Sequence, residues 1–457
     1  MTSRSLSFMS DPLLPGPCKA CATPSAIPRS CLAPAIASRP AGLLGSLHPD
    51  FQRFPMTRLL TASDIATLVA RHQDGRTLAQ DFYMAPQVFT ADRERIFFRD
   101  WHLAGHVSEI PDTGDYLLFD MLGESVVVLR DDAGAVRAFA NVCRHRGARL
   151  CSQQTGHVRR LTCPYHAWSY GLDGALVHAR QLDAGEDRSA LGLKPVAVEV
   201  FEGLIYVSLS DRPAGFDALR AELTPHVRPF GLARTKIAAR RSYPVQANWK
   251  LLVENYNECY HCTAAHPEFA RSHATHMTAD RVAPLNAALA ARSAQAGLST
   301  AHIDRIGLAA PAGSPDYAYN RYALFDGYQT GSADGEPLAP LLGDIQAYDG
   351  GASDIYVGML NPMLVYCDHA ILYRFIPTGP LTCIQEILWL VHEDAVEGRD
   401  YDTDRLTWLW HVTTEADKRI IEANQQGVAS RFYEPGPLVE MESYTRRFHD
   451  AYLARMR

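Results

Sequence analysis

Residues 141–170 read NVCRHRGARLCSQQTGHVRRLTCPYHAWSY and contain two short pairs of metal-binding residue types. The first pair is Cys143-x-His145, and the second is Cys163-x-x-His166. Zinc sites usually pair Cys with Cys and His with His, whereas each pair here mixes one Cys with one His. A Rieske [2Fe–2S] centre requires this mixture, because two thiolates hold one iron and two imidazoles hold the other. The stretch therefore predicts a Rieske centre, with a zinc site or plain packing as the alternatives.

The composition is that of an ordinary globular protein, and the length suggests two or three domains. Of the 457 residues, 47% are hydrophobic and 21% are charged, which is typical of soluble proteins. The formal net charge of −7 argues against nucleic acid or an anionic membrane surface as a partner. No apolar run reaches the length of a membrane span. Ten irregularly spaced cysteines in so long a chain favour a reducing, cytoplasmic setting over a disulfide framework.

Residues 1–55 differ from the rest of the chain. They are rich in Pro, Ala and Ser and show no sustained apolar period, so we expect a disordered extension. Cys18, Cys21 and Cys31 lie there without a His or a second Cys pair beside them, and we expect no metal site from them. Translation that starts at Met56 is a second explanation, in which the extension is not part of the native protein.

The hydrophobic pattern that follows predicts three folded parts. Residues 56–98 begin with a helix over Thr61–Arg71, opened by a Ser or Asp cap, and are expected to join the second domain. Residues 99–210 consist of short apolar segments separated by Gly and Asp turns, which predict an antiparallel β domain around the cluster. Residues 211–457 are expected to form a second domain with antiparallel strands and helices.

A second informative stretch is QANWKLLVENYNECYHCTAAHPEF, residues 246–269. Its apolar residues recur at helical spacing as far as Tyr260, which predicts one helix. Glu254, Glu258 and His261 fall on a neighbouring face, and His266 lies near the helix end. Two His with a carboxylate can supply part of a 2-His-1-carboxylate triad, which leaves positions on Fe(II) open for O2 and substrate. A one-electron carrier such as a Rieske centre needs an acceptor of this kind. By contrast, His273 and His276 are expected to be surface residues.

With both motifs and their order in view, residues 60–457 resemble the oxygenase component, or alpha subunit, of Rieske non-haem iron oxygenases. The family motif acid-x-x-His-x(4)-His is matched by Glu258, His261 and His266. The family takes its third iron ligand from an Asp on a C-terminal helix. TTEADKRIIEANQQGVASRFYEPGPL resembles that helix, which implies Asp417 as the ligand. Glu415 is the nearest competitor, and Asp404 is a remote one.

The resemblance also implies a fold, an electron path and a set of partners. The fold is α+β, with an antiparallel Rieske β domain and a helix-grip (START/Bet v 1-like) catalytic domain. In a homotrimeric ring, His166 of one chain would pass electrons through Glu258 of the next chain to His261. Each chain would hold one [2Fe–2S] cluster and one mononuclear Fe(II). NAD(P)H and flavin would belong to a separate ferredoxin-reductase-type partner, since this chain has no nucleotide-binding Gly fingerprint.

The substrate is indicated less directly. Residues 280–350 are expected to be loop-rich and hold a cluster of five aromatic residues: Tyr317, Tyr319, Tyr322, Phe325 and Tyr328. Such a cluster is usually packing, but it could also wall a pocket for a quaternary ammonium through cation–π attraction. This stretch and the end of the helix that bears Asp417 are similar to glycine betaine monooxygenases. That similarity implies hydroxylation of an N-methyl group by O2, which would convert glycine betaine to dimethylglycine and formaldehyde.

Several other functions fit the same motifs. The substrate could be another methylammonium compound, such as proline betaine, carnitine or choline. An aromatic-ring dioxygenase would share both metal sites but would take an apolar arene. A pure electron-transfer Rieske protein would lack the mononuclear iron, and a zinc-binding module would lack both iron sites.

Overall fold

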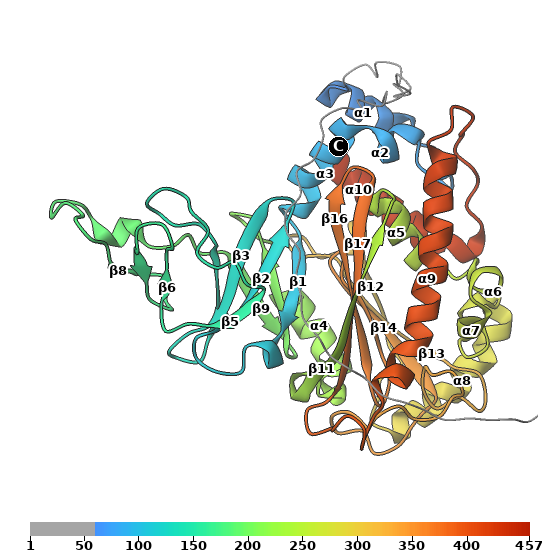
Figure 1. Ribbon diagram of the computed structural model, residues 1–457. Coiled ribbons are helices and arrows are strands. Elements are labelled where there is room, and N and C mark those ends of the chain that lie inside the picture. The colour runs from blue at the N-terminus through green and yellow to red at the C-terminus, as the bar shows by residue number, and fades with distance from the viewer. Residues whose placement is uncertain (1–59) are drawn as a thin grey trace, which may run out of the picture. The chain divides into compact units, whose positions relative to one another are not determined.

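Antiparallel sheets dominate residues 60–457, which are the part of the chain that the computed structural model describes (Figure 1). The expected extension over residues 1–55, the three cysteines within it and the Met56 start lie outside the described residues. Within residues 60–457 the strands form one seven-stranded sheet and three smaller ones, accompanied by helices. The expected α+β class with antiparallel sheets is therefore confirmed. Among the described helices, none combines the length and the apolar character that crossing a membrane requires.

The first described helices precede the sheets. They are α1 (Ala62–Arg71), α2 (Gln80–Met84) and α3 (Pro86–Asp92). The cap of α1 is Thr61 rather than a Ser or Asp, because the Asp64 N–H donates to Thr61 Oγ1 while the Thr61 N–H donates to the Asp64 carboxylate. This reciprocal capping box satisfies two backbone donors that the helix leaves without partners.

Three small sheets follow along the chain. The first has the strand order β1 (Trp101–His106), β10 (Leu204–Ser208), β9 (Ala197–Phe201). The second has the order β4 (Val136–Ala140), β3 (Glu124–Arg130), β2 (Asp115–Met121), β5 (Thr155–His157). The third is made of β6 (Leu161–Thr162), β7 (Ser169–Tyr170) and β8 (Leu176–His178).

Strand β3 is buried on both faces and joins two hydrophobic cores. Val126 and Val128 face the large core that the catalytic part of the chain shares, whereas Val127 and Leu129 face the core beneath the cluster loops. Successive side chains of a strand point to opposite faces, so the sequence ESVVVLR is apolar without alternation because both faces are covered. The loops that carry the Cys and His pairs are thereby fixed to the rest of the described chain.

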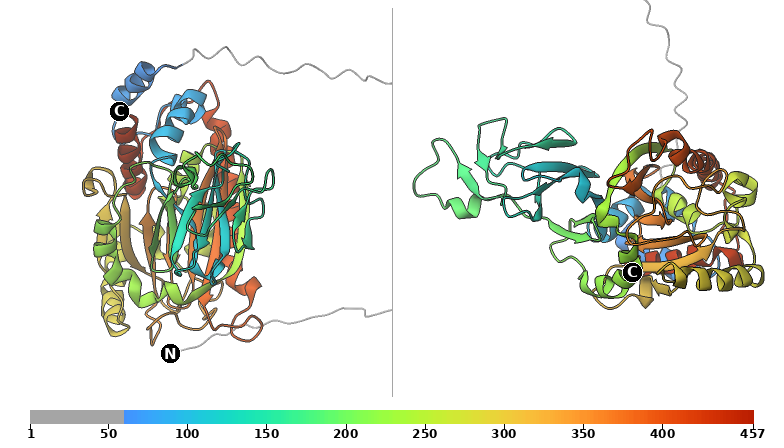
Figure 2. Two further views of the ribbon diagram at one scale, coloured as in Figure 1. Left: turned by 90° about the vertical axis from the view of Figure 1, so that its left-hand side faces the viewer. Right: turned by 90° about the horizontal axis from the view of Figure 1, so that it is seen from below.

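The large sheet has seven strands that run side by side (Figure 2). Its order is β11 (Thr235–Val245), β17 (Thr382–His392), β16 (Ala370–Gly379), β15 (Pro362–Val365), β14 (Gly351–Val357), β13 (Tyr317–Ala323), β12 (His302–Arg305). The remaining α-helices are α4 (Asp217–Val227), α5 (Trp249–Tyr256), α6 (Cys262–Ala265), α7 (Pro267–Ala270), α8 (Ala279–Gln295), α9 (Thr403–Val428) and α10 (Ser443–Met456). The 17-residue helix α8 corrects the expectation that residues 280–350 are loop-rich for the start of that stretch, whereas residues 324–350 form loops as expected. The sequence of α8 is rich in Ala, the residue of highest helix propensity.

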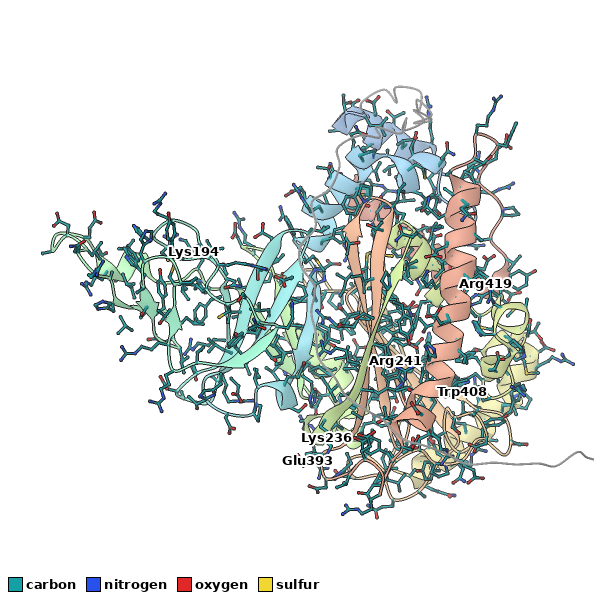
Figure 3. The ribbon with its side chains drawn as sticks, in the orientation of Figure 1. Lys194, Lys236, Arg241, Glu393, Trp408 and Arg419 are labelled. Atoms are coloured by element: carbon teal, nitrogen blue, oxygen red, sulfur yellow. A yellow bond between two sulfur atoms is a disulfide. The ribbon has the colours of Figure 1, made fainter. Side chains whose placement is uncertain are left out.

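Helix α9 lies beside β11 and α5 (Figure 1). Trp410, Thr414 and Ile421 are buried on its inner side, and Trp408 and Arg419 are exposed on its outer side (Figure 3). Side chains of α9 also hold the start of α5. Glu422 accepts the Gln246 N–H at 2.9 Å, and Gln425 accepts the Asn248 N–H at 2.8 Å. These bonds fix the position of α9 along its axis relative to α5.

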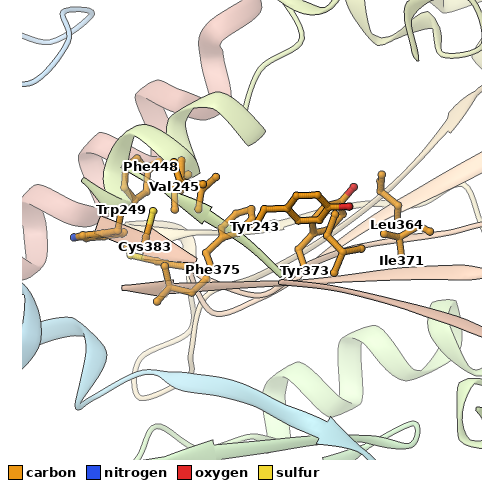
Figure 4. Close-up of a cluster of buried hydrophobic side chains, with 14 of the residues drawn as sticks. Tyr243, Val245, Trp249, Leu364, Ile371, Tyr373, Phe375, Cys383 and Phe448 are labelled. Carbon is orange, nitrogen blue, oxygen red and sulfur yellow. The ribbon is translucent and has the colours of Figure 1, made fainter. Parts of the chain in front are cut away.

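A buried ion pair joins α3, α5 and α10. Lys250 Nζ lies 2.5 Å from Asp92 Oδ2, and both side chains are fully buried. The Asp92 carboxylate also accepts the Trp249 Nε1–H and the Tyr452 hydroxyl, each at 2.9 Å. Around this pair, Trp249 packs edge-on against Phe448 at one end of the core (Figure 4). Burial lowers the pKa of Lys250, and Asp92 opposes that effect.

Removing one member of this pair should destabilise the protein strongly. Asp92→Asn leaves the Lys250 charge buried without a counter-ion, and we expect a loss of about 3–5 kcal/mol in unfolding free energy. The measurement is urea unfolding followed by fluorescence. The control is Glu94→Gln, which removes an exposed ion pair with Arg93 and should change stability by no more than about 0.5 kcal/mol. Equal unfolding midpoints for the two variants would contradict this account.

Candidate functional site

The two predicted cluster loops have the same backbone hydrogen bonds. The Cys143 N–H donates to Ala148 O, and the Cys163 N–H donates to Trp168 O, both at 2.8 Å. The N–H groups of Gly147 and Ala167 donate back to the carbonyls of Cys143 and Cys163, both at 3.0 Å. Gly147 and Ala167 are both left-handed, with φ of 77° and 60°. Left-handed backbone suits Gly and is uncommon for Ala, so the second loop turns at Ala167, while Pro164 lies earlier in it.

The four predicted ligands are carried by these two loops, and the two histidines lie in contact. The thiols of Cys143 and Cys163 are free and buried, whereas His145 and His166 are exposed. The two imidazoles face each other with their Nδ1 atoms 3.1 Å apart. Two thiols on the inner side and two ring nitrogens on the outer side fit the donor set of a Rieske cluster. An electron can therefore reach or leave such a cluster at the exposed imidazole edge.

Three residues that the motif did not single out support the loops. The Tyr170 hydroxyl accepts the Arg144 N–H at 3.0 Å and lies 3.3 Å from Cys143 Sγ. Asn141 is buried, and its Oδ1 accepts the N–H groups of Leu150 and Cys151. Trp168 stacks on the His145 ring, with centroids 4.7 Å apart. Sequence offers little signal for these roles, since buried Tyr, Asn and Trp are common.

The second predicted site is built on a broken helix. Helix α5 ends at Tyr256, and His261 lies just before the short helix α6. His266 lies between α6 and α7, which begins at Pro267. The single helix predicted through Tyr260 is therefore wrong, and Tyr260 is exposed. This break turns both imidazoles toward α9, which a continuous helix at this spacing would not do.

His261, His266 and Asp417 come together at one point. Asp417 Oδ1 lies 3.2 Å from His261 Nε2 and 3.0 Å from His266 Nε2, and the two Nε2 atoms are 3.0 Å apart. Asp417 Oδ1 is buried and forms no well-aligned hydrogen bond. Three donor atoms that converge in this way fit a divalent cation, and their types match a facial triad for Fe(II). Of the rival acids, Glu415 is exposed and Asp404 lies in the first turn of α9.

Glu258 orients His261 from the other side. Its Oε1 lies 2.5 Å from His261 Nδ1, and its Oε2 accepts the N–H groups of Tyr260 and His261. With Nδ1–H donated to Glu258, the Nε2 lone pair of His261 is left for a metal. Although burial acts to lower the pKa of His261, the adjacent carboxylates of Asp417 and Glu258 outweigh it and raise that pKa to about 9. The cluster thus favours positive charge at its centre.

Other expectations for this region need correction. Glu254 does not join the cluster, because its carboxylate accepts hydrogen bonds from Tyr83 and His449 at 2.8 and 2.9 Å. His273 is not a surface residue: it is fully buried and bonds the Tyr366 hydroxyl at 2.6 Å. Its low-polarity surroundings lower its pKa to about 3.

A disulfide links Cys259 and Cys262 on either side of His261. The cysteine pattern had not suggested it. Cys262 Sγ lies near the two His nitrogens but is bonded to Cys259, so it does not serve as a metal ligand.

A cavity of about 570 Å3 opens onto the three converging donors. Its walls come from α5 to α8, the sheet, α9 and α10, and its aromatic lining consists of Tyr256, Phe269, Tyr322, Tyr356, Tyr373, Phe375, Trp410 and Tyr444. Of the aromatic cluster that the sequence indicated, only Tyr322 lines this cavity; Tyr317 and Tyr319 are packed in a separate core. Asp354 also lines the cavity, and nothing in the sequence pattern had marked it.

Comparison with known families agrees with this division of the chain. Residues 100–201 match the Rieske [2Fe-2S] domain, and residues 232–457 match the catalytic domain of the ring hydroxylating alpha subunit. Structures with the same fold include a quaternary ammonium Rieske monooxygenase in complex with L-carnitine, with a TM-score of 0.63 and 23% identity over 86% of this chain and 98% of that one. Naphthalene 1,2-dioxygenase from Rhodococcus sp. has a TM-score of 0.60 and 19% identity over 87% and 97%.

Relatives with higher identity are oxygenase subunits. The chain is 38% identical to the glycine betaine monooxygenase oxygenase subunit of Chromohalobacter salexigens, over 81% of this chain and 84% of that one. It is 36% identical to the corresponding subunit of Pseudomonas aeruginosa, over 83% and 89%. The oxygenase subunit of Escherichia coli carnitine monooxygenase is 37% identical over 44% and 55%. A match of this extent, with both domains present in the same order, means that the chain belongs to the Rieske non-haem iron oxygenases, oxidoreductases that hold a [2Fe–2S] cluster and a mononuclear iron and receive electrons from a partner reductase.

Proposed function

We propose that this chain is the oxygenase subunit of an enzyme that hydroxylates an N-methyl group of a quaternary ammonium compound, with glycine betaine as the first substrate to test. The observation that carries the proposal is the cavity, whose tyrosine-rich walls open directly onto His261, His266 and Asp417. Aromatic walls attract quaternary ammonium groups. Two relatives that match over 81% and 83% of this chain act, by their names, on glycine betaine.

In the proposed reaction one oxygen atom of O2 enters a methyl C–H bond, and two electrons with two protons reduce the other atom to water. The N-hydroxymethyl product then loses its hydroxyl proton and releases formaldehyde as the C–N bond breaks, which leaves the tertiary amine. Bound iron would supply the activation of O2. His261, His266 and Asp417 would hold it, while the cavity orients one methyl group and excludes water.

We further propose that Cys143, His145, Cys163 and His166 hold the Rieske cluster and that electrons leave through His166. Glu258 would receive them from a neighbouring chain in a ring of three and would pass them to His261. The exposed His166 ring and the contact between Glu258 and His261 Nδ1 support this path. Residues 99–210 would form the electron-carrying domain, and residues 56–98 with 211–457 the catalytic one. The assembly would work in the cytoplasm.

The main rival is an aromatic-ring dioxygenase. The structural likeness to naphthalene 1,2-dioxygenase extends to the fold, and the cavity holds the carboxylate of Asp354, set among tyrosines, besides those near the iron. An arene gives such a carboxylate nothing to bind, whereas an ammonium does. Isotope-labelled O2 with glycine betaine should yield dimethylglycine and formaldehyde in equal amounts, with the label in the formaldehyde trapped before exchange with water. Absence of turnover with every methylammonium compound, together with diol formation from an arene, would sink the proposal.

Asp417→Ala should remove the mononuclear iron and leave the Rieske cluster. We expect iron content to fall from about three to about two per chain, because one of the three converging donors is lost. The Rieske EPR signal should be unchanged, and formaldehyde production should fall below detection. Glu415→Ala is the matched control, since this carboxylate lies two residues away on the exposed side of α9. Unchanged iron and product in Asp417→Ala would refute the assignment of the third ligand.

Glu258→Gln should separate electron transfer from metal binding. The amide keeps the size of the side chain but loses the charge that faces His261, so both iron centres should stay occupied. We expect oxidation of the reduced cluster, in the presence of substrate and O2, to slow by about 10–100-fold. Glu268→Gln on the neighbouring helix α7 serves as the control. If the reduced cluster reacts at the same rate in both variants, Glu258 is not on the electron path.

A further inference from the structure

A single carboxylate lies among the tyrosines of the cavity, on the sheet side of the iron site. Asp354 belongs to β14, and its Oδ1 accepts the Tyr256 hydroxyl at 3.2 Å. The Tyr256 ring in turn packs edge-on against Tyr373, Phe375 and Tyr356, with centroids 5.1, 5.7 and 5.8 Å apart. The side chains come from α5, β14 and β16, so the fold brings the carboxylate and the rings together from three separate elements.

Within the described residues, Asp354 has no cationic partner. The residues that line the cavity include no Lys or Arg, and the hydroxyl of Tyr256 is the side-chain donor to this carboxylate. Two fully buried carboxylates of the described residues do have cationic partners: Asp92 pairs with Lys250, and Asp349 pairs with Arg321. Burial raises the pKa of Asp354 to about 7, against the opposing effect of the Tyr256 hydrogen bond. Asp354 is half-buried in the cavity wall, and a carboxylate that is partly removed from water without a counter-ion is costly for a fold to keep, unless the positive charge arrives with a ligand.

We infer that Asp354 is the counter-ion for the quaternary ammonium of the substrate. With Tyr256, Tyr356 and Tyr373 around it, this carboxylate lets the cavity distinguish charged methylammonium compounds from neutral compounds of the same shape. The inference rests on the proposed function and deepens it. Aromatic rings contact a trimethylammonium and a tert-butyl group over similar areas, so shape and apolar contact separate the two weakly. Cation–π attraction of the rings already favours the ammonium, and the carboxylate adds a charge–charge attraction that the neutral ligand does not experience.

The same lining indicates which end of a betaine the chain recognises. A substrate carboxylate meets no Lys or Arg among the lining residues, and the neutral amides of Asn286 and Asn320 are the kind of donor that remains. Most of the selectivity among ligands should therefore come from contacts with the ammonium end of the substrate. Choline, which carries an ammonium and a hydroxyl but no carboxylate, isolates this contribution.

The test compares two ligands of nearly equal shape. Choline and 3,3-dimethyl-1-butanol differ in that a carbon atom replaces the charged nitrogen. Binding to the iron-loaded, cluster-containing protein is measured by calorimetry without O2, so that no turnover occurs. We expect the wild-type chain to prefer choline by about 30-fold or more. In Asp354→Asn, which can still accept the Tyr256 hydrogen bond, the preference should fall to less than about 5-fold, and affinity for glycine betaine should fall with it.

Two controls keep the result specific. Glu440→Gln removes another carboxylate that lines the cavity and should leave the preference for choline unchanged. Asp354→Glu retains the charge and should retain a preference for choline. The inference is overturned if Asp354→Asn prefers choline as strongly as the wild-type chain does. It is also overturned if Asp354→Asn and Glu440→Gln lose the preference for choline to the same extent.

A measurement on the wild-type chain gives an independent reading, even if Asp354→Asn fails to fold. Because the pKa of Asp354 in the free protein is about 7, its carboxylate takes up a proton as the pH falls below 7. The preference for choline should then decrease by up to about tenfold per pH unit. The groups that face Asp354 from α5, β13, β14, β16 and α10 are phenols whose pKa values are raised, chiefly by burial, so they stay neutral in this range: Tyr256, Tyr322, Tyr356, Tyr373 and Tyr444.

A preference that does not change between about pH 8 and about pH 5.5 would overturn the inference. Failure of the proposed function looks different. In that case the wild-type chain binds no methylammonium compound and releases no formaldehyde, whatever residue occupies position 354.

Discussion

Three lone-pair donors that point at one spot repel each other until a cation lies between them, and the fold has to hold them there. His261 and His266 come from the broken segment after α5, and Asp417 comes from α9. The bonds from Glu422 and Gln425 to the start of α5 set the position of α9, and the buried inner face of α9 fixes its rotation. Apolar burial and hydrogen bonds to the backbone thus offset the free-energy cost of holding the three donors close together, before any metal binds.

The same frame fixes the substrate cavity. Its walls are tyrosines from α5, β13, β14, β16 and α10, side chains that combine large apolar surface with a hydroxyl. The carboxylate of Asp354 and the carboxylate of Asp417 lie in one cavity, and in our proposal they serve different positive charges. One would hold the metal, and the other would hold the ammonium whose methyl group faces that metal. Orientation of the reacting C–H bond would then follow from two charge contacts rather than from shape alone.

The sequence predicted what depends on local spacing. The Cys143–His145 and Cys163–His166 pairs could be read directly, because each loop carries its own ligands and its own turn. Resemblance pointed to Asp417, which lies far from both histidines along the chain and has Glu415 as a near neighbour of the same chemistry. The break after Tyr256 was missed because the apolar period continues to Tyr260, although that side chain is exposed.

Asp354 could not be found from sequence, since its significance depends on neighbours from four other elements. Burial of His273 was missed for a similar reason. Its surroundings come from Phe269, which stacks on it, and from Tyr366 far along the chain. Local patterns report secondary structure and ligand pairs, whereas the character of a pocket depends on which elements the tertiary fold brings together.

The two cluster loops, which have the same backbone hydrogen bonds, bear on how the protein folds in the cell. The adjacent sheet β6-β7-β8 consists of strands of only two or three residues, which is too short for independent stability. The cysteines in this part of the described chain, Cys143, Cys151 and Cys163, form no disulfide. If each loop gives one thiolate and one imidazole, the inorganic cluster ties the two loops together as a disulfide would. Assembly of the cluster is then a step of folding, and under iron limitation we expect this region to be the first that quality-control proteases recognise.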